Sequence, residues 1–290
     1  MGRLVDVDDT RLWVEERGVK GAFPLLVFHG GPGLDHHMFG DYLDPLTSDG
    51  RYRLVLVDER AQGGSDRSAS PDTWTLERMA ADVSALAAAL GVRDRYATLG
   101  HSYGAFVVLQ HAVDAPGEPR GTIVSAGVPA ARWLDGVQEQ LATFEPVSLR
   151  EQVTQSWARE STVATEDEAA SLLADQMPFH FRDPQGALLD EYIKRADGAR
   201  FSPDVLRHFA TQEYGGIDVE DRLDKVAHPV LVLAGRHDRT CAAAASEAMA
   251  EQLPNAELVV FEDSAHMMFV EENARYLDVV RRFLDRVSVG

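Results

Sequence analysis

Short, nearly continuous hydrophobic runs alternate with amphipathic stretches along most of the chain. The runs predict buried strands at residues 24–30, 53–59, 96–100, 121–127, 229–235 and 256–262. Continuous hydrophobicity, without a polar residue at every second position, is typical of parallel strands that helices cover on both faces. The clearest helical period lies at residues 75–91, where Gly91 provides a C-terminal stop. This alternation predicts an α/β fold with an open, doubly wound and mostly parallel sheet, and residues 11–18 predict an extra antiparallel edge strand.

The alternation of strands and helices breaks between residues 130 and 226. This part of the chain is rich in charges and helix-forming residues, and no run in it predicts a strand. The pattern therefore predicts a helical insertion over 130–226 that lies as a cap over the sheet. Residues 1–129 and 227–290 then form one α/β core from two pieces of the chain.

Composition and charge limit the environment and the partners of this fold. The chain has 290 residues, 45% of them hydrophobic, which is enough to bury a large core. The net charge of −19 argues against nucleic acid and anionic membranes as partners, because both attract basic patches. The single cysteine, Cys241, excludes an intrachain disulfide, and no run reads as a signal peptide or a membrane span. We therefore expect a cytoplasmic protein, and the oligomeric state stays open.

The sequence Gly-His-Ser-Tyr-Gly at residues 100–104 marks a corner between a predicted strand and a predicted helix. In a parallel α/β sheet, ligands bind outside the carboxyl ends of the strands, where this corner lies. A Gly-x-Ser-x-Gly corner holds its serine in a strained conformation, and glycines two residues away avoid collisions with neighbouring backbone. We therefore predict Ser102 as a nucleophile, with an ordinary tight turn as the simpler alternative.

A nucleophilic serine needs a base, and the base needs an acid that orients it. Asp238 follows the predicted strand 229–235, and His266 follows the predicted strand 256–262. This is the chain order of nucleophile, acid and base that belongs with such a corner. We therefore predict Asp238 as the orienting acid and His266 as the base.

Four other residues are weaker candidates for chemistry. We expect His101, which precedes the predicted nucleophile, to be a packed residue, and Asp263 to be a surface carboxylate. The neighbours His36 and His37 suggest a metal, but no second cluster of ligands has a suitable spacing. We expect neither a metal nor a cofactor.

The loop His-Gly-Gly-Pro-Gly at residues 29–33 follows the first predicted parallel strand. Glycines there leave a backbone N–H free to stabilise a developing oxyanion. Pro32 has no N–H and stiffens the loop, which makes Gly31 the best donor. The second predicted donor is the backbone N–H of Tyr103, directly after the nucleophile. A purely structural loop is the alternative.

These motifs together resemble the proline iminopeptidases of the α/β-hydrolase fold, over essentially the whole chain. The resemblance rests on HGGPG at 29–33, GHSYG at 100–104, SAGVPAARW after the strand 121–127, and AGRHD and SAH at matching intervals. The first motif is the most specific, because many other hydrolases share the serine corner. The resemblance implies the roles already predicted for five positions: Ser102, Asp238, His266, Gly31 and Tyr103.

Proline iminopeptidases remove an N-terminal residue and hold its ammonium group with acidic side chains. The resemblance implies one such acid at Glu213, in the segment TQEYGG near the end of the cap. A solvated cap carboxylate is the alternative for this residue. A second acid often follows the catalytic aspartate in that family, but Arg239 stands there in this chain.

The sequence thus predicts a serine hydrolase that cleaves an amide bond after a free-amino N-terminal residue, through an acyl-enzyme. Its substrate would be a small molecule or short peptide with a free amino group. Two alternatives stay open. One is an amidase, esterase or lactonase acting on a small or secondary metabolite, and the other is a non-catalytic binding protein on a hydrolase scaffold. Dehalogenase or epoxide-hydrolase chemistry would need an aspartate at the corner, so Ser102 argues against it.

Overall fold

A single eight-stranded sheet forms the centre of the protein. The computed structural model describes residues 2–196 and 198–289, and its strands follow the order β1-β2-β4-β3-β5-β6-β7-β8. Strands β3 to β8 run parallel, while β2 pairs antiparallel with both β1 and β4. The strands are Gly2–Val7 (β1), Thr10–Gly18 (β2), Phe23–Phe28 (β3), Tyr52–Asp58 (β4), Ala97–His101 (β5), Gly121–Ser125 (β6), Val230–Gly235 (β7) and Ala256–Phe261 (β8).

The predicted α/β class and the mostly parallel sheet are confirmed, with small shifts at the strand ends. The edge was predicted incompletely. Residues 11–18 fall within β2, but β1 pairs outside it and is the true edge strand. Arg3 and Asp6 interrupt the hydrophobic pattern of β1, and only its positions Val5 and Val7 are buried. An edge strand covered on one face carries no continuous apolar run.

Helices cover both faces of the sheet and bury two separate cores. Leu26 and Phe28 of β3 join the core beneath α1, α2 and α8, whereas Leu25 and Val27 join the core beneath α9 and α10. Alternate side chains of a strand point to opposite faces, so a doubly covered strand must be apolar throughout. The helices of this region are Leu76–Ala89 (α1), Tyr103–Asp114 (α2), Ala243–Gln252 (α8), Met268–Glu271 (α9) and Asn273–Val287 (α10).

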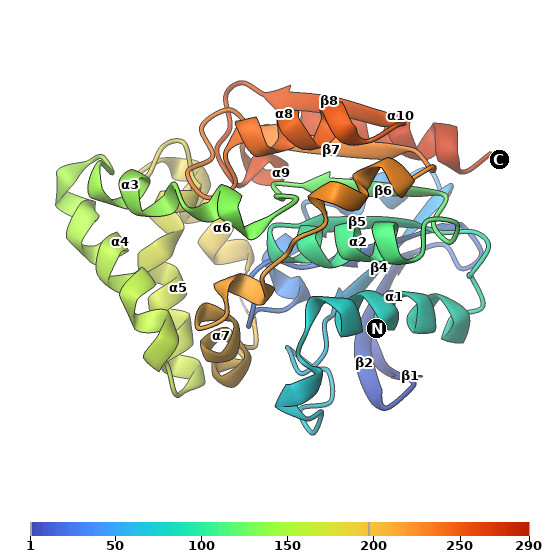
Figure 1. Cartoon of the computed structure of the whole chain (residues 1–290), viewed down its shortest axis with the longest axis horizontal. Coiled ribbons are helices and arrows are strands. Elements are labelled where there is room, and N and C mark those ends of the chain that lie inside the picture. The colour runs from blue at the N-terminus through green and yellow to red at the C-terminus, as the bar shows by residue number, and fades with distance from the viewer. Residues whose placement is uncertain (1, 197, 290) are drawn as a thin grey trace.

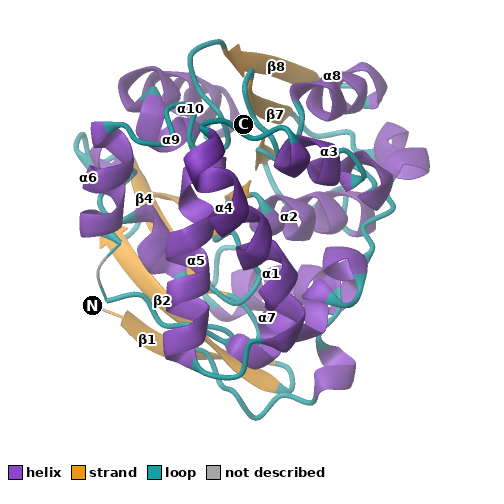
Figure 2. Ribbon diagram, turned by 90° about the vertical axis from the view of Figure 1, so that its left-hand side faces the viewer, coloured by secondary structure: helices purple, strands orange, loops and turns teal. Residues whose placement is uncertain are grey.

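The chain leaves the sheet after β6 and returns at β7, and the segment between them is helical. In Figure 1 this cap stands beside the sheet, and Figure 2 looks onto its helices α4 and α5, which lie side by side. The side chain of Thr165 and that of Glu168 form a capping box that starts α5. The cap helices are Val137–Ala142 (α3), Val147–Arg159 (α4), Glu166–His180 (α5), Ala187–Arg195 (α6) and Pro203–Ala210 (α7).

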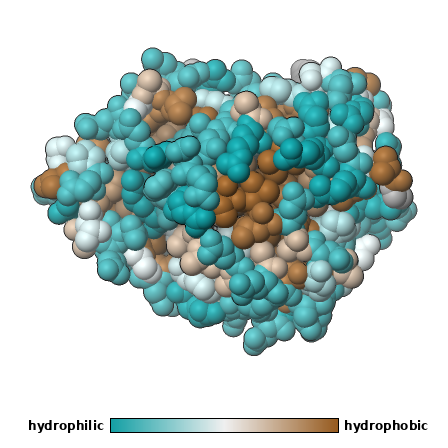
Figure 3. All heavy atoms as spheres, turned by 90° about the horizontal axis from the view of Figure 1, so that it is seen from above, coloured by the Kyte–Doolittle hydropathy of each residue, from teal (hydrophilic) through white to brown (hydrophobic). Residues whose placement is uncertain are grey.

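Short 3₁₀ turns connect these elements. They are His36–Phe39 (η1), Asp44–Thr47 (η2), Pro71–Thr73 (η3), Ala131–Leu134 (η4), Glu160–Thr162 (η5), Glu213–Gly215 (η6) and Glu220–Lys225 (η7). Polar side chains cover most of the face seen in Figure 3, with an apolar patch near its centre. Across the described residues, every helix is too short or too polar to cross a membrane.

Candidate active site

Ser102 occupies the corner between β5 and α2 in a conformation that ordinary residues rarely adopt. Its φ is 57° and its ψ is −118°, and its backbone N–H donates to the carbonyl of Ser125 on β6 at 2.9 Å. The flanking glycines are required by close approaches of the backbone. A Cβ on Gly100 would collide with the carbonyl of Gly104, and a Cβ on Gly104 would collide with the carbonyl of Phe28. The corner therefore holds the serine in a strained, fixed position.

Asp238 and His266 come together from the loops after β7 and β8. The Nδ1–H of His266 donates to Oδ2 of Asp238 at 2.7 Å, and both residues are buried, with 3% and 7% exposure for the histidine and the aspartate. The other oxygen of Asp238 accepts the backbone N–H groups of Thr240 at 2.8 Å and Cys241 at 2.9 Å. Both oxygens of the aspartate are thus hydrogen-bonded, and the bond at Nδ1 leaves Nε2 of His266 to accept a proton.

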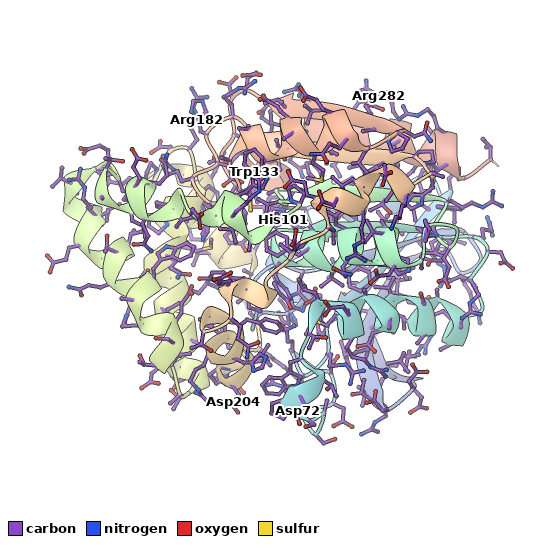
Figure 4. The ribbon with its side chains drawn as sticks, in the orientation of Figure 1. Asp72, His101, Trp133, Arg182, Asp204 and Arg282 are labelled. Carbon is purple, nitrogen blue, oxygen red and sulfur yellow. The ribbon has the colours of Figure 1, made fainter. Side chains whose placement is uncertain are left out.

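Ser102 and His266 line the same cavity, which has a volume of about 630 Å³. Figure 4 labels His101, the neighbour of Ser102 in the chain, at the junction of the cap and the sheet. Among the described residues no hydrogen bond joins the Ser102 hydroxyl to His266, and without substrate such bonds are often long. Much of the cavity wall is apolar, from the core and from the cap: Leu34, Met38, Phe106, Trp157, Leu172 and Phe201.

The loop after β3 brings a backbone N–H donor to this cavity. Gly31 has a φ of 125°, which favours glycine, and it lies in the cavity wall together with Tyr103. Within the described chain the N–H of Gly30 points at the sulfur of Met38, and the N–H of Gly33 donates to Gln62. Among the residues that the structure describes, neither the amide of Gly31 nor that of Tyr103 at the start of α2 has a protein acceptor. The two amides predicted as oxyanion donors are therefore available for that role.

Buried polar residues of the loop after β4 hold this glycine loop in place, and no motif in the sequence marks them as functional. Oε1 of Gln62 accepts the Gly33 N–H at 2.5 Å, and its Nε2 donates to Glu59 at 3.0 Å. The ring of His29 bonds the carbonyl of Gly30 at 2.7 Å through Nδ1 and accepts the Glu59 N–H at 3.2 Å through Nε2. Burial raises the pKa of Glu59 well above its ordinary value and lowers that of His29, so both favour their neutral forms.

Glu160 and Glu213, two of the cap carboxylates in the described cavity wall, have different environments. Glu213 is exposed in η6 at the cavity wall. Glu160, which no motif in the sequence marks, is only 5% exposed. Its carboxylate accepts a hydrogen bond from Nε2 of Gln176 at 2.5 Å and another from the hydroxyl of Tyr214. Burial raises the pKa of Glu160 against the opposing effect of these two bonds.

The guanidinium of Arg239 binds the backbone of the cap. Its guanidinium donates to the carbonyls of Phe179 at 2.9 Å and Phe181 at 2.8 Å, and it lies over the ring of Phe144 at 5.2 Å. Burial lowers the pKa of this group, with Asp238 acting in the opposite direction. The position where the resemblance places a second acid is therefore a link between the core and the cap.

The cluster of Asp35, His36 and His37 brings three possible metal ligands within 4.8 Å of one another. Its imidazoles already have partners. Nδ1 of His36 bonds Asp58 at 2.6 Å, and Nδ1 of His37 bonds Asp35 at 2.8 Å, which raises the pKa of His37. Since these nitrogens point at carboxylates, we interpret the cluster as two histidine–carboxylate pairs.

His101 is packed in the interior and Asp263 is at the surface, as the sequence predicted for both. His101 is fully buried and packs against the ring of His266, and Asp263 is an exposed carboxylate that forms an ion pair with Arg182. Cys241 is buried beside Asp238, and burial raises the pKa of its thiol well above the ordinary value.

Comparisons with known proteins agree with this geometry. Residues 24–273 match the family described as alpha/beta hydrolase fold. A proline iminopeptidase of Clostridium botulinum is 27% identical over 91% of this chain and 90% of its own length. Two solved structures share the fold over nearly their full lengths. They are a proline iminopeptidase of Mycobacterium smegmatis (TM-score 0.75, 23% identity, 100% of this chain and 99% of the other) and an esterase of Thermogutta terrifontis (TM-score 0.74, 21% identity, 99% of each chain).

The resemblance to proline iminopeptidases found in the motifs is thus confirmed as a similarity that spans about nine-tenths of the chain. The family match covers most of the sheet, the serine corner and the loops that carry Asp238 and His266. The chain is a hydrolase and belongs to the α/β-hydrolase fold family.

Proposed function

We propose that this hydrolase is a serine aminopeptidase that cleaves the amide bond after a residue with a free amino group. The observation that carries the proposal is the buried carboxylate of Glu160 in the cavity that Ser102 and His266 line. Within the described residues Glu160 has two hydrogen-bond donors but no cationic partner. A buried carboxylate is costly unless a cation compensates it, and a substrate ammonium group would supply that cation.

The proposed reaction uses the chain's own groups throughout. Nε2 of His266 removes the proton of the Ser102 hydroxyl as its oxygen attacks the substrate carbonyl carbon. The N–H groups of Gly31 and Tyr103 stabilise the oxyanion, and Asp238 orients the imidazole and stabilises its charged form. The imidazolium then protonates the leaving amine, which departs and leaves an acyl ester on Ser102. Water, deprotonated by the same histidine, hydrolyses the ester and restores the serine.

The charges around the cavity support a cationic substrate. Asp135, Glu160 and Glu213 contribute carboxylates to the described cavity wall, whereas Arg132 contributes its one guanidinium. That guanidinium forms an ion pair with Glu220 and so is partly neutralised. The relatives that are named proline iminopeptidases point to the same class of substrate.

A second candidate function is an esterase or amidase for an uncharged metabolite. The mostly apolar wall and the volume of about 630 Å³ favour it, because such a cavity accommodates a ligand of drug-like size. The cation of Arg239, at the position where the resemblance places a second acid, favours it as well.

A substrate panel separates the two candidates. The purified enzyme is assayed with alanine and proline p-nitroanilides, with the N-acetylated forms of both, and with p-nitrophenyl acetate. An aminopeptidase should prefer each free amine over its N-acetylated form by about tenfold or more in kcat/KM, because acetylation removes the charge that Glu160 would bind. Equal rates on both forms, or turnover of the ester alone, would favour the second candidate.

A further inference from the structure

Residues 179–182, at the C-terminal end of α5 and just beyond it, contact both loops that carry the predicted acid and base. On the Asp238 side, the guanidinium of Arg239 donates to the carbonyls of Phe179 and Phe181. The hydroxyl of Thr240 lies 3.3 Å from Nδ1 of His180. We name residues 179–182 the α5 end.

The α5 end is bound to the His266 loop as well. The backbone N–H of His266 donates to the carbonyl of His180 at 3.0 Å. The carboxylate of Glu271 bridges the two segments, since it accepts the N–H of Arg182 at 2.7 Å and that of Ala265 at 2.8 Å. Arg182, labelled in Figure 4 where the cap meets the C-terminal part of the chain, adds an exposed ion pair with Asp263.

Two further imidazoles pack against the His266 ring. Its centroid lies 4.9 Å from that of His101, on the core side, and 4.9 Å from that of His180, in the cap. Burial and the neighbouring imidazole hold the pKa of both His101 and His180 well below the ordinary value. Both therefore stay neutral near pH 7 and do not repel an imidazolium that forms between them. Among the described residues, Asp238, Cys241 and Glu271 are further titratable groups near the His266 ring, and Arg239 lies near His180.

The same helix reaches the buried carboxylate of the cavity. Gln176 donates to Glu160, and His180 follows four residues later, which places the two side chains on neighbouring turns of one helical face. A shift of α5 would therefore move the partner of Glu160 and the neighbour of His266 together.

We propose that the α5 end is a positioning element for His266, and that His180 is the positioning residue that fixes the orientation of its imidazole. General-base catalysis then requires the cap to be docked, because the α5 end supplies hydrogen bonds to both loops of the predicted pair. This rests on the proposed role of His266 as base, but not on the proposed recognition of an amine. A ring held on one side only would still bind Asp238 but would sample orientations from which Nε2 misses the serine proton.

The test compares His180→Ala and His180→Phe in the full chain, with p-nitrophenyl acetate, which carries no ammonium group for Glu160. We expect His180→Ala to lower kcat about 10- to 100-fold with little change in KM, since displacement by about an ångström can cost 100-fold. His180→Phe keeps a ring beside His266 and should restore much of this loss. The matched control is His208→Ala, because His208 is a cap histidine whose ring bonds the carbonyl of Trp74, away from both loops.

Arg239→Lys gives a second test if His180→Ala does not fold. It keeps the charge, but the shorter lysine side chain ends before the position from which Nη1 of Arg239 donates to both carbonyls, and we expect a fall in kcat of about 5- to 30-fold without a matching change in KM. Wild-type kcat in folded His180→Ala, or in Arg239→Lys if His180→Ala does not fold, would overturn the proposal. Equal losses in His180→Ala and His208→Ala would also overturn it, because they would reveal a general effect of the cap on stability. Failure of amine recognition would appear in the acetylation comparison and would leave these ester rates unaffected.

Discussion

Replacing Glu160 by glutamine tests the proposed recognition of an ammonium group most directly. The carboxylate is 5% exposed, so water screens its charge weakly. A charge-assisted hydrogen bond in such a place contributes about 1.5–3 kcal/mol. Since about 1.36 kcal/mol corresponds to a factor of ten, Glu160→Gln should lower kcat/KM for free-amine substrates about 10- to 150-fold.

Glu213→Gln is the matched control, because Glu213 is an exposed carboxylate of the same cavity wall. Exposed ion pairs contribute about 0–1 kcal/mol, so this change should cost no more than about fivefold. The motifs alone favour Glu213 as the residue that reads the ammonium group, whereas burial favours Glu160. The variant that loses more kcat/KM on the amine substrate therefore shows which of the two carboxylates binds the ammonium group, Glu213 as the motifs favour or Glu160 as burial favours.

The assay measures kcat/KM on alanine p-nitroanilide and on p-nitrophenyl acetate for both variants, with thermal unfolding as a check of the fold. In Glu160→Gln the amide oxygen can still accept one of the hydrogen bonds from Gln176 and Tyr214. The amide nitrogen that replaces the second carboxylate oxygen cannot accept the other. Some loss of stability is therefore expected. The reasoning is refuted if Glu160→Gln loses the same factor on the amine and on the ester, or if Glu213→Gln loses more on the amine.

Three further predictions concern the serine chemistry and one buried acid. Ser102→Ala should lose about 10⁴-fold in turnover and all labelling by a fluorophosphonate probe, and labelling at another residue would contradict the nucleophile. Asp238→Asn should keep its circular dichroism but lose about 10³- to 10⁴-fold in kcat, because it favours the wrong tautomer of His266; an active variant would exclude this pair. Burial raises the pKa of Glu59 in the folded protein. The free energy of unfolding therefore falls as the pH rises from the ordinary pKa of a glutamate to this raised pKa. Glu59→Gln removes the titration, so its melting temperature relative to wild type should rise as the pH is raised above 4.5, the ordinary pKa of a glutamate; a constant difference would contradict this.

The parallel part of the fold could be predicted because its signal is local. A strand covered on both faces must be apolar at every position, so a short run of Leu, Val and Phe reveals it without knowledge of its neighbours. The edge strand β1 gave a weaker signal, since its polar positions face water. The positions of Ser102, Asp238 and His266 near the ends of strands could be predicted for the same reason, because each lies within five residues of the end of such a run.

Glu160 and His180 could not be identified in this way. Glu160 is one of 47 acidic residues, and its burial depends on Gln176 and on Tyr214, which is 54 residues away in the chain. No periodic pattern encodes how the cap helices pack over the cavity. His180 lies at the end of α5 without a motif around it, and only the folded chain brings its ring to His266.

Arg239 stands where the proline iminopeptidases often have a second acid, and it binds the cap instead of offering a carboxylate. An acid directly after Asp238 would offer a second carboxylate, but this guanidinium is directed at the carbonyls of Phe179 and Phe181. A cation there repels a substrate ammonium group, so the amine of a substrate has to lie away from this residue. Glu160 is the buried carboxylate of the cavity wall that meets this requirement without contacting Arg239. The arginine thus binds the cap to the loop of Asp238, and the buried carboxylate of that same cap is where we propose that the positive charge of the substrate binds.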